Sequence, residues 1–317
     1  MRNTPEPVTA IDAGPDGAPA VSVIVPCFRH AGPLARCLQA LAGQRFDAPF
    51  EVIVVDSAAD PEVAAAASSA GVRLVRNTRP SPRLRPGDAR NLGARQARGT
   101  VLAFTDADCV PDPEWLAGAV AALAAGARLA GGPVLDARPL HPIAASDNLL
   151  QFAEFPPSRP DGPATHFPGC NMAVRRTDFN VVGGFPTVRL PAGEDTAFCN
   201  AVLARWPNGL RFTRGMRVRH AGRTGLLAFL RHHTTFGFCR GALGLHLRPV
   251  HRRIGVRASM IVPVALGRLS YVLRRSGQWA PASLPRIVLL LPLLLPGLVA
   301  WAVGFRRGLL AARGESA

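Results

Sequence analysis

From residue 21 onward the chain alternates short apolar runs with segments of helical period. The runs predict strands at residues 21–25, 51–55, 72–75 and 101–105. The segments between them predict helices at about residues 33–41, 61–70 and 88–99. Continuous apolar strands separated by helices are typical of a parallel sheet covered on both faces. The first hundred or so residues therefore predict a doubly wound α/β fold.

Polar residues follow three of these strands, at residues 26–29, 56–57 and 106–108. In open parallel sheets, ligands bind beyond the carboxyl ends of the strands, so these stretches are candidates for a binding site. Asp106 and Asp108 are separated only by Ala107. Two carboxylates this close repel each other unless a cation, a hydrogen-bond network or solvent compensates them.

The regular alternation fades after about residue 130, where loops rich in Pro and Gly precede a helix that starts near Glu194. We interpret residues 21–245 as one domain with two halves that meet at about residue 130. Residues 1–20 contain Pro, Gly and acids but no apolar signal-peptide core, which predicts a disordered leader.

The C-terminal part has a different character. Residues 287–305 carry no charge and lie between Arg286 and Arg306, which is long enough to span a bilayer. Residues 260–273 form a shorter apolar stretch that contains Arg268, so it is expected to be interfacial. A buried core helix, or an in-plane hairpin with both ends in the cytosol, is the alternative for the longer stretch. Residues 246–317 are thus predicted to be membrane-associated, at the cytoplasmic face of the cell membrane.

Composition narrows the class of protein. The 317 residues are 48% hydrophobic, enough for a real core, and the net charge of +16 comes from basic residues that are all arginine. This excess of arginine over acidic residues reflects either a biased composition or an anionic partner. Aromatic residues make up only 6% of the chain, with a single tyrosine, which argues against nucleic-acid binding. The six cysteines show no C-x-x-C spacing, so neither a zinc site nor a disulfide framework is expected.

Two common nucleotide-binding chemistries are excluded. The first strand is followed by "PCFRHAG" rather than G-x-G-x-x-G, and a P-loop needs a lysine that the chain lacks. A D-x-D after a strand suits Mg²⁺ or Mn²⁺, which take one or two carboxylates plus substrate phosphates. A solvated turn or a cap for the following helix is the alternative at this point.

Six blocks in order carry a family resemblance. They read "VSVIVPCFRH", "EVIVVDSA", "GDARNLGARQARGTVLAFTDADCVPDPEWL", "FPGCNMAVRR", "GGFPTVRLPAGEDTAFCNAVL" and "RVRHAG". Over residues 21–222 the chain resembles the inverting family 2 glycosyltransferases of GT-A fold. That fold has a Rossmann-like, mostly parallel sheet with helices on both faces.

The resemblance implies a nucleotide-sugar half up to about residue 130, with a donor and metal site, and an acceptor half from there to residue 245. The donor-binding residues that it implies are Pro26, Phe28, Asp56, Arg90, Asn91 and Asp106. Asp56 matches the first acid of the family's V-D-D-x-S block, whereas Ser57 replaces the second acid. The metal, Mn²⁺ or Mg²⁺, would be held by Asp106, Asp108 and His220.

The resemblance also implies an acceptor side. Glu194 and Asp195 match an E-D pair in which the aspartate is the general base, and Cys170 and Asn171 fall in the acceptor region. A carboxylate must take the proton of the acceptor hydroxyl as the new bond forms, because that hydroxyl has a pKa far above 7. One such displacement inverts the anomeric centre.

The expected activity is a nucleotide-sugar-dependent, hexosyltransferase-type transfer to an acceptor hydroxyl. The Q-x-x-R-W block of processive members is absent, which predicts transfer of one sugar or a few. The C-terminal segment suggests a lipid-linked or cell-envelope glycan as acceptor, in cell envelope biogenesis. A nucleotidyltransferase of similar fold and a non-catalytic, membrane-associated binding protein are the alternatives. His232 and His233 are expected to be surface or acceptor-side groups.

Overall fold

The structure is a computed structural model that describes residues 18–77, 84–244 and 257–314. Most of the predicted leader and the first residues of the predicted membrane-associated segment lie outside these ranges. The chain forms two compact units that are interleaved along the sequence. Unit 1 comprises Met1–Pro133, Pro160–Thr187 and Glu194–Val218, and unit 2 comprises Val134–Arg159, Val188–Gly193 and Arg219–Ala317. The domain boundaries expected from the sequence stay predictions.

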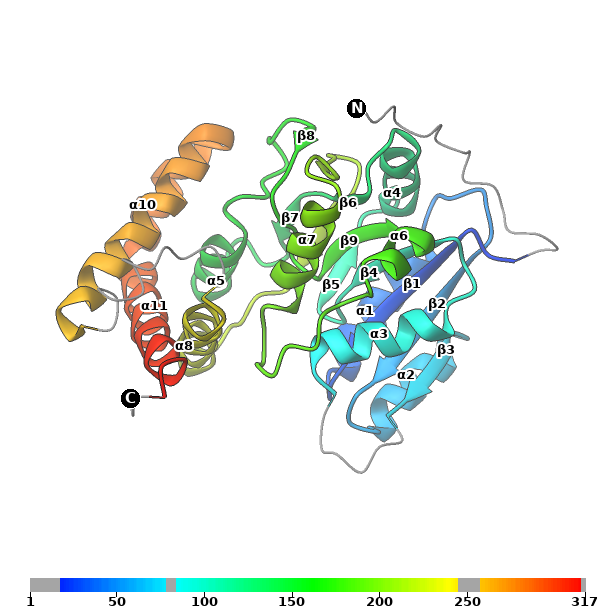
Figure 1. Cartoon of the computed structure of the whole chain (residues 1–317), viewed down its shortest axis with the longest axis horizontal. Helices are drawn as coiled ribbons and strands as arrows, with labels where there is room; N and C mark the ends of the chain where they lie inside the picture. Colours follow the sequence, from blue (N-terminus) through cyan, green and yellow to red (C-terminus); the bar gives the residue numbers. More distant parts are fainter. Residues whose placement is uncertain (1–17, 78–83, 245–256, 315–317) are drawn as a thin grey trace. The chain divides into compact units, whose positions relative to one another are not determined.

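Unit 1 is built on an eight-stranded sheet (Figure 1). Its strands, in the order of the sheet, are β3 (Arg73–Arg76), β2 (Phe50–Asp56), β1 (Val21–Cys27), β4 (Val101–Thr105), β9 (Asn171–Arg175), β6 (Leu129–Gly131), β10 (Leu210–Phe212) and β8 (Gly162–Pro163). The first four strands are parallel, and every residue of β4 is buried. The predicted mostly parallel α/β sheet is confirmed.

Helices cover the sheet of unit 1. They are α1 (Ala31–Ala42), α2 (Pro61–Ser69), α3 (Pro86–Gln96), α4 (Trp115–Ala124), α6 (Arg176–Val181) and α7 (Glu194–Arg205). Helix α2 begins where a side-chain oxygen of Asp60 accepts from the Glu62 amide at 2.9 Å. Helix α3 packs against β1 and β2, and Gly93 permits the approach, because a Cβ there would lie 2.6 Å from Cγ2 of Ile24.

The sequence pattern missed a central strand. β9 lies between β4 and β6 and is antiparallel to both, in a region read as loops. Its five residues "NMAVR" are too short to show a period, and a short turn that contains Gly169 precedes them. The strand is specified by burial against its neighbours, since Asn171, Met172, Ala173 and Val174 are all buried.

Unit 2 is mainly helical. Its elements are β7 (Val134–Asp136), β11 (Val218–His220, which starts in unit 1), α5 (Pro142–Phe152), α8 (Leu226–Leu243), η2 (Ala258–Met260), α10 (Ile261–Trp279), η3 (Pro281–Ser283) and α11 (Leu284–Ala311); β5 (Cys109–Pro111) belongs to unit 1. Leu150, Phe229, Val272 and Leu294 belong to one buried apolar cluster that joins α5, α8, α10 and α11.

Helices α8 and α11 touch through their backbones. A Cβ on Gly237 would lie 1.9 Å from the Trp301 carbonyl oxygen, and one on Gly304 would lie 2.0 Å from that of Thr234. Gly241 and Gly308 repeat the contact four residues on, so each helix presents a small-xxx-small stripe to the other. By length and composition, one helix of the described residues, Pro281–Ala311, is apolar enough to cross a membrane, with a mean hydropathy of 2.4 over an 18-residue window.

Candidate active site

A pocket opens at the carboxyl edge of β1 and β4 in unit 1. Its volume is about 180 Å³. It is lined by Pro26, Cys27, Phe28, His30, Ser57, Leu84, Pro86, Arg90, Asp106, Ala107 and Asp108. Strands β1 and β4 are parallel neighbours, with Ile24 opposite Phe104, so the residues after both strands meet at one edge. Pro26, Phe28, Arg90 and Asp106 were all predicted to bind the donor. The structure brings them together with Asp108, the second carboxylate of the D-x-D.

Arg90 links two of the predicted site carboxylates. Its Nη2 donates to Oδ1 of Asp106 at 2.6 Å, and its Nη1 donates to Oε1 of Glu194 at 2.7 Å. The Arg90 side chain is only 3% exposed, whereas that of Asp106 is 34% exposed toward the pocket. The guanidinium carbon also lies 5.6 Å from the centre of the Phe185 ring. Arg90 is therefore a buried cation that joins the strand-end acid to the first turn of α7.

The charges around Arg90 perturb one another. Burial opposes the charge on Arg90, but Asp106, Glu194 and Asp195 outweigh it and raise its pKa. Burial, followed by the neighbouring Asp195, raises the pKa of Glu194 to about 7, although Arg90 acts in the opposite direction. The Glu194 carboxyl therefore exchanges its proton near neutral pH.

Two glycines make room for this ion pair. A Cβ on Gly169 would lie 2.6 Å from the guanidinium carbon of Arg90, and one on Gly87 would lie 3.0 Å from Cβ of Glu194. Any other residue at Gly169 would displace the guanidinium. The sequence analysis did not assign a role to Gly169, although it lies in the "FPGCN" block.

Asp195 lies in the first turn of α7, where the helix dipole favours an acid. Its Oδ1 accepts from the Thr196 amide at 2.7 Å, and its Oδ2 accepts from the Gly169 amide at 3.2 Å. The Gly169 amide thus holds the carboxylate of Asp195. Because Gly169 has no side chain, it also leaves room for the guanidinium of Arg90. Two backbone amides therefore hold this half-buried carboxylate in place, and its role as general base stays a prediction.

Cys170, next in sequence to Gly169, is 4% exposed. The hydrogen bond with Cys109 lowers the pKa of its thiol, but burial together with the nearby Asp106 and Asp108 outweighs this and leaves the pKa raised. A thiol with a raised pKa is not a nucleophile at neutral pH.

Three other predicted site residues make hydrogen bonds inside unit 1. Buried Asp56 accepts from the amides of Ala58 and Asp60 at 3.0 and 2.8 Å. Asn91 exchanges two hydrogen bonds with the Phe185 backbone, at 2.8 and 2.9 Å. Buried Asn171 accepts from the Trp115 indole at 2.8 Å and donates to two carbonyls. These contacts fix loops and β9, and the substrate roles of these residues stay predictions.

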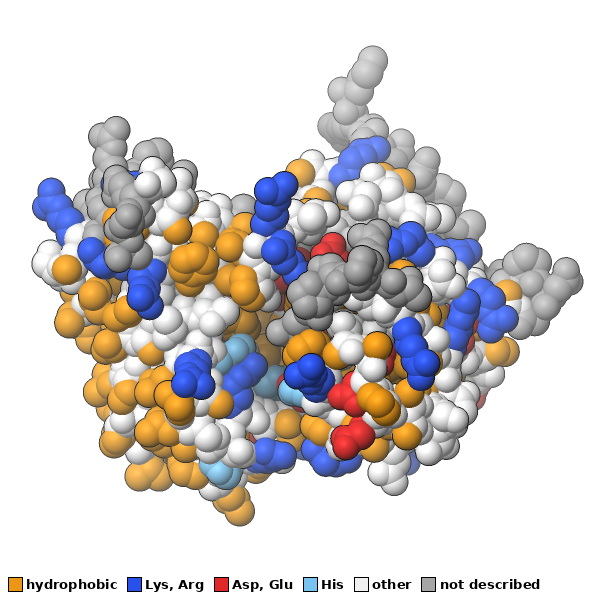
Figure 2. Space-filling view, turned by 90° about the horizontal axis from the view of Figure 1, so that it is seen from below, with side chains coloured by type: hydrophobic (Ala, Val, Ile, Leu, Met, Phe, Trp, Pro, Cys, Tyr) orange, Lys and Arg blue, Asp and Glu red, His pale blue; other side chains and the backbone are white. Residues whose placement is uncertain are grey.

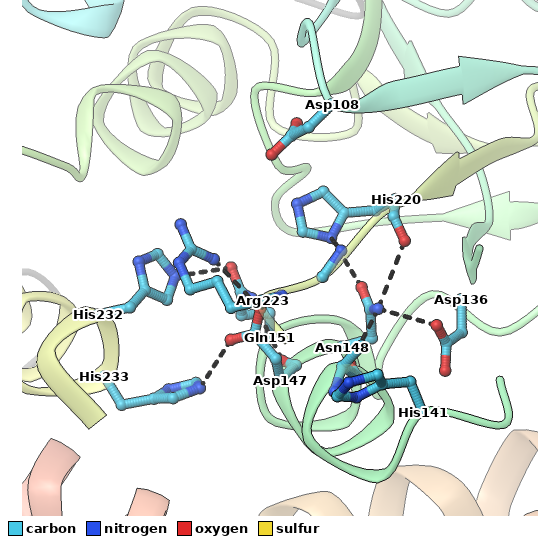
Figure 3. Close-up of polar contacts among 12 residues, drawn as sticks. Asp108, Asp136, His141, Asp147, Asn148, Gln151, His220, Arg223, His232 and His233 are labelled. Atoms are coloured by element: carbon cyan, nitrogen blue, oxygen red, sulfur yellow. Dashed lines mark hydrogen bonds and ion pairs between the residues drawn. The ribbon is translucent and has the colours of Figure 1, made fainter. Parts of the chain in front are cut away.

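Unit 2 contains a separate polar cluster around α5 (Figure 3). Asp147 is fully buried and accepts from the Arg223 amide at 3.0 Å, the Arg223 Nη1 at 3.1 Å and the His233 Nε2 at 3.0 Å. Although burial alone would raise it, these partners lower the pKa of Asp147 to about 2. Burial, helped by Arg223, lowers the pKa of His232 to about 2.

His233 in this cluster is only 2% exposed, so it is not a surface group. The next residue on α5, Asn148, contacts the ring of His220 at 2.8 Å. The sequence analysis missed Asp147 and Asn148 because they lie outside the six blocks.

The comparisons with known proteins decide the family. The sequence model of glycosyl transferase family 2 matches residues 22–183, just over half of the chain. The chain belongs to glycosyl transferase family 2. The resemblance inferred from the six blocks is thereby confirmed.

Two known proteins are similar to this family 2 chain. Glycosyltransferase AglE from Haloferax volcanii is 30% identical over 184 residues, which are 56% of this chain and 59% of AglE. The chain thus matches less than two thirds of the length of AglE. Mannosyltransferase PcManGT from Pyrobaculum calidifontis, solved in complex with GDP-Man and Mn²⁺, has a TM-score of 0.59 at 23% identity. The likeness covers 95% of this chain and 90% of PcManGT, and it establishes the GT-A fold.

The ligand types expected for a metal in this family 2 chain are present. Asp106 and Asp108 line the pocket of unit 1, and His220 belongs to unit 2. Carboxylate oxygens such as those of Asp106 and Asp108 suit Mn²⁺ or Mg²⁺. Among the described residues, no three His, Cys, Asp or Glu side chains are grouped closely enough to hold a metal. The sharing of one metal by these three residues stays a prediction.

Proposed function

We propose that this family 2 chain is a metal-dependent, inverting glycosyltransferase that moves a hexosyl group from a nucleotide sugar to an acceptor hydroxyl, without processive synthesis. The observation that carries the proposal is the pocket that gathers Phe28, Arg90, Asp106 and Asp108 at one sheet edge. PcManGT, which shares the fold, was solved with a nucleotide sugar and Mn²⁺. Family membership favours glycosyl transfer over the nucleotidyl transfer considered as an alternative.

The pocket residues serve the donor. Asp106 and Asp108 would hold Mn²⁺ or Mg²⁺, which when bound supplies Lewis-acid stabilisation of the departing diphosphate. Pro26 and Phe28 form the pocket wall against which the nucleotide is placed. Asp56 and Asn91, held by backbone contacts, keep the surrounding loops in position for the donor.

Asp195 is the general base. Its carboxylate, held by the amides of Gly169 and Thr196, takes the proton of the acceptor hydroxyl as that oxygen attacks the anomeric carbon. Attack from the face opposite the diphosphate inverts the anomeric centre. The acceptor side is supported by Glu194, Cys170 and Asn171. These residues hold the first turn of α7 and the start of β9 beside Asp195.

A lipid-linked or cell-envelope glycan is the proposed acceptor, because unit 2 has an apolar outer face. On α10 and α11 large apolar side chains point outward: Val262 is 60% exposed, Leu266 53% and Leu289 78%. On α10 the buried positions instead include the small residues Ala265 and Ser276. Hydrophobic side chains gather on the side of the molecule that carries these helices (Figure 2).

The charge of the C-terminal segment also supports contact with a membrane. Residues 257–314 contain eight arginines and no acidic residue. An apolar face flanked by cations fits an anionic lipid surface. We therefore propose that α10 and α11 attach the enzyme to the cytoplasmic face of the cell membrane.

A thermal-shift screen of nucleotide sugars, with and without Mn²⁺, tests the donor site. A donor present at about 100 times its Kd stabilises the fold by about 2.7 kcal/mol. We expect the sugars of one nucleotide to raise the Tm of the wild type only when Mn²⁺ is present, and to leave the Tm of Asp108→Ala unchanged. The absence of any Mn²⁺-dependent shift in the wild type would contradict the proposal, as would an equal shift in the variant.

Vesicle flotation tests the membrane face. The double variant Leu266→Ser/Leu289→Ser should bind vesicles that contain anionic phospholipid at least about tenfold more weakly than the wild type, because two exposed leucines are lost. Val181→Ser, which changes an exposed apolar residue of α6 in unit 1, is the matched control and should bind as the wild type does. Equal flotation of all three proteins would refute the attachment.

A further inference from the structure

The two units differ in net charge. Unit 1 contains 19 arginines and 17 acidic residues, whereas unit 2 contains 18 arginines and four acidic residues. A bias toward arginine alone would affect both units, and the arginines are shared almost evenly between them. What unit 2 lacks is acidic residues, so most of the net charge of +16 lies there. This distribution favours an anionic partner for unit 2.

A row of alternating cations and aromatic rings runs along one side of α10. Arg268, Tyr271, Arg275 and Trp279 follow one another at intervals of three or four residues, so they share a helix face. The guanidinium carbon of Arg275 lies 5.4 Å from the centre of the Tyr271 ring and 4.8 Å from that of Trp279. The guanidinium carbon of Arg268 lies 5.8 Å from the Tyr271 ring and 5.0 Å from the ring of Trp301 on α11. Cation–π contacts thus hold both guanidiniums in fixed positions.

A buried acid, Glu154, contacts this row. Its Oε1 lies 3.5 Å from Nη2 of Arg275, and its Oε2 accepts from the Tyr271 hydroxyl. The other two described acids of unit 2, Asp136 and Asp147, pair with arginines outside the row. Arginines therefore outnumber the acid at this side of α10, and an anion would lower the cost of holding them together.

The solvent-facing edge of the row is open. The Arg275 side chain is 26% exposed, and its Nη1 donates to Oε1 of the exposed Gln278 at 3.2 Å. Its Nε has no hydrogen-bond partner in the part of the chain that the structure describes. Arg274 precedes Gln278 by one helical turn and is also exposed, and a Cβ on Gly277 would meet nothing within 4 Å. Two cations and a neutral oxygen acceptor therefore border a surface with room for a ligand.

We propose that Arg274, Arg275 and Gln278 form a binding site for the phosphate of an anionic phospholipid, in which a phosphate oxygen replaces the Gln278 oxygen as the partner of Arg275. The planar guanidinium matches phosphate, and an ionised acceptor forms a stronger hydrogen bond with it than a neutral amide does. The rest of the helix favours a lipid as the source of the phosphate. Val262 and Leu266 on α10 are 60% and 53% exposed, and Trp and Tyr side chains are typical of the membrane interface. The inference rests on the proposed function, in which α10 contacts a membrane.

Vesicle flotation of the full chain with Gln278→Glu tests the site. The new carboxylate lies one turn from both arginines, so it would occupy them and repel a phosphate while the row of cations and rings stays intact. We expect binding to phosphatidylglycerol vesicles at least about tenfold weaker than that of the wild type. Binding to phosphatidylcholine, whose choline neutralises the phosphate, should be unchanged.

Arg231→Gln is the matched control for that variant. Arg231 is an exposed residue of α8, and its loss lowers the charge of unit 2 by one, as Gln278→Glu does. One general surface cation accounts for about fivefold in binding to an anionic membrane, so the control should lose no more than that. An equal loss in both variants would show that charge alone matters and would overturn the site.

The wild type separates this inference from the membrane attachment itself. It should bind phosphatidylglycerol vesicles at least about tenfold more tightly than phosphatidylcholine vesicles. Equal binding to both would overturn the phosphate site and leave the attachment standing, whereas flotation with neither would overturn both. Arg275→Lys keeps the charge but not the planar fork, so it should lose most of the preference for phosphatidylglycerol. Full preference in a folded Arg275→Lys would also overturn the site.

Inorganic phosphate tests the other source of the anion. In the absence of vesicles, millimolar phosphate should leave the Tm of the wild type unchanged relative to chloride of equal ionic strength, because the free anion lacks the apolar anchor of a lipid. A rise in Tm in the wild type that is absent in Gln278→Glu would show that the site takes the free anion. That result would overturn the assignment to a lipid.

Discussion

The two units bury charge in opposite ways. In unit 1 a buried cation, Arg90, lies between the carboxylates of Asp106 and Glu194. In unit 2 a buried carboxylate, Asp147, lies between Arg223 and His233. Both arrangements satisfy the rule that a buried charge needs a partner, but the central charges have opposite signs.

The difference gives the two clusters opposite dependence on pH. Glu194 has a raised pKa of about 7, so the folded state holds its proton over a range in which the unfolded chain, at its ordinary value of 4.5, has lost it. Stability from this group is therefore present at low pH and is lost as the pH rises toward 7. Asp147 has a lowered pKa, so stability from it is present above its ordinary value of 3.8 and is lost as the pH falls toward 2.

Removing the cation at the centre of the unit 1 cluster should have the largest effect. Arg90→Met leaves the buried carboxyl of Glu194 and the partly exposed carboxylate of Asp106 without a counter-charge, which should lower the free energy of unfolding by about 3–5 kcal/mol. Urea denaturation measures the change. Arg90→Lys keeps the charge but not the fork that reaches Asp106 and Glu194 together, so it should lose less. A loss below about 1 kcal/mol in Arg90→Met would contradict the central role of this side chain.

The pH profile of Glu194→Gln should show the next largest effect. Between pH 5 and 7 the wild type should lose up to about 3 kcal/mol from this group, as follows from a shift of its pKa from 4.5 to about 7. The variant has no carboxyl at this position and should lack that slope. Free energies of unfolding measured on both proteins across this range test the sign. Parallel profiles would show that Glu194 does not titrate in this window.

Asp147→Asn tests the opposite sign in unit 2. The shift of its pKa from 3.8 to about 2 corresponds to about 2 kcal/mol of stability at neutral pH. The variant should be less stable than the wild type by about this amount at pH 7, and the gap should close as the pH falls from 4 to 2. Acid titration followed by circular dichroism measures it, and a gap that widens toward pH 2 would contradict the assignment.

Two single glycine substitutions test how far the stability of unit 2 depends on the contact between α8 and α11 rather than on its charged cluster. Gly304→Ala should lower stability by about 1 kcal/mol net, because its Cβ would meet the Thr234 backbone at 2.0 Å while alanine improves helix propensity. Gly267→Ala on α10 meets nothing within 4 Å and should raise stability by up to about 1 kcal/mol. Thermal unfolding compares the two, and a stabilised Gly304→Ala would argue against the close backbone contact.

The parallel part of the fold could be predicted from the sequence, because β1, β2 and β4 are long apolar runs between periodic helices. Strand β9 could not, since its central position depends on pairing with β4 and β6, which lie 40 or more residues earlier in the chain. Helix α8 has no apolar stripe of helical period that would predict it from the sequence. Arg, His and Thr interrupt its apolar residues, and its contact with α11 depends on glycines.

The candidate site was predictable as a set of positions but not as a network. The blocks singled out Arg90, Asp106 and Glu194, yet not that the guanidinium of Arg90 joins the other two, which lie 16 and 104 residues further along the chain. Asp147 and Asn148 could not be found, because their importance comes from burial against residues more than 70 positions away. Such long-range pairing leaves no local pattern.

The most direct test of the proposed reaction is the release of nucleoside diphosphate by Asp195→Asn, with the donor identified by thermal shift and a total lipid extract as the source of acceptor. We expect transfer to fall by about 10²–10⁴-fold, the usual contribution of a general base, while Mn²⁺-dependent stabilisation by the donor persists. Asp108→Ala should lose both. Transfer at the wild-type rate in Asp195→Asn would contradict the assignment of the base and, with it, the proposed mechanism.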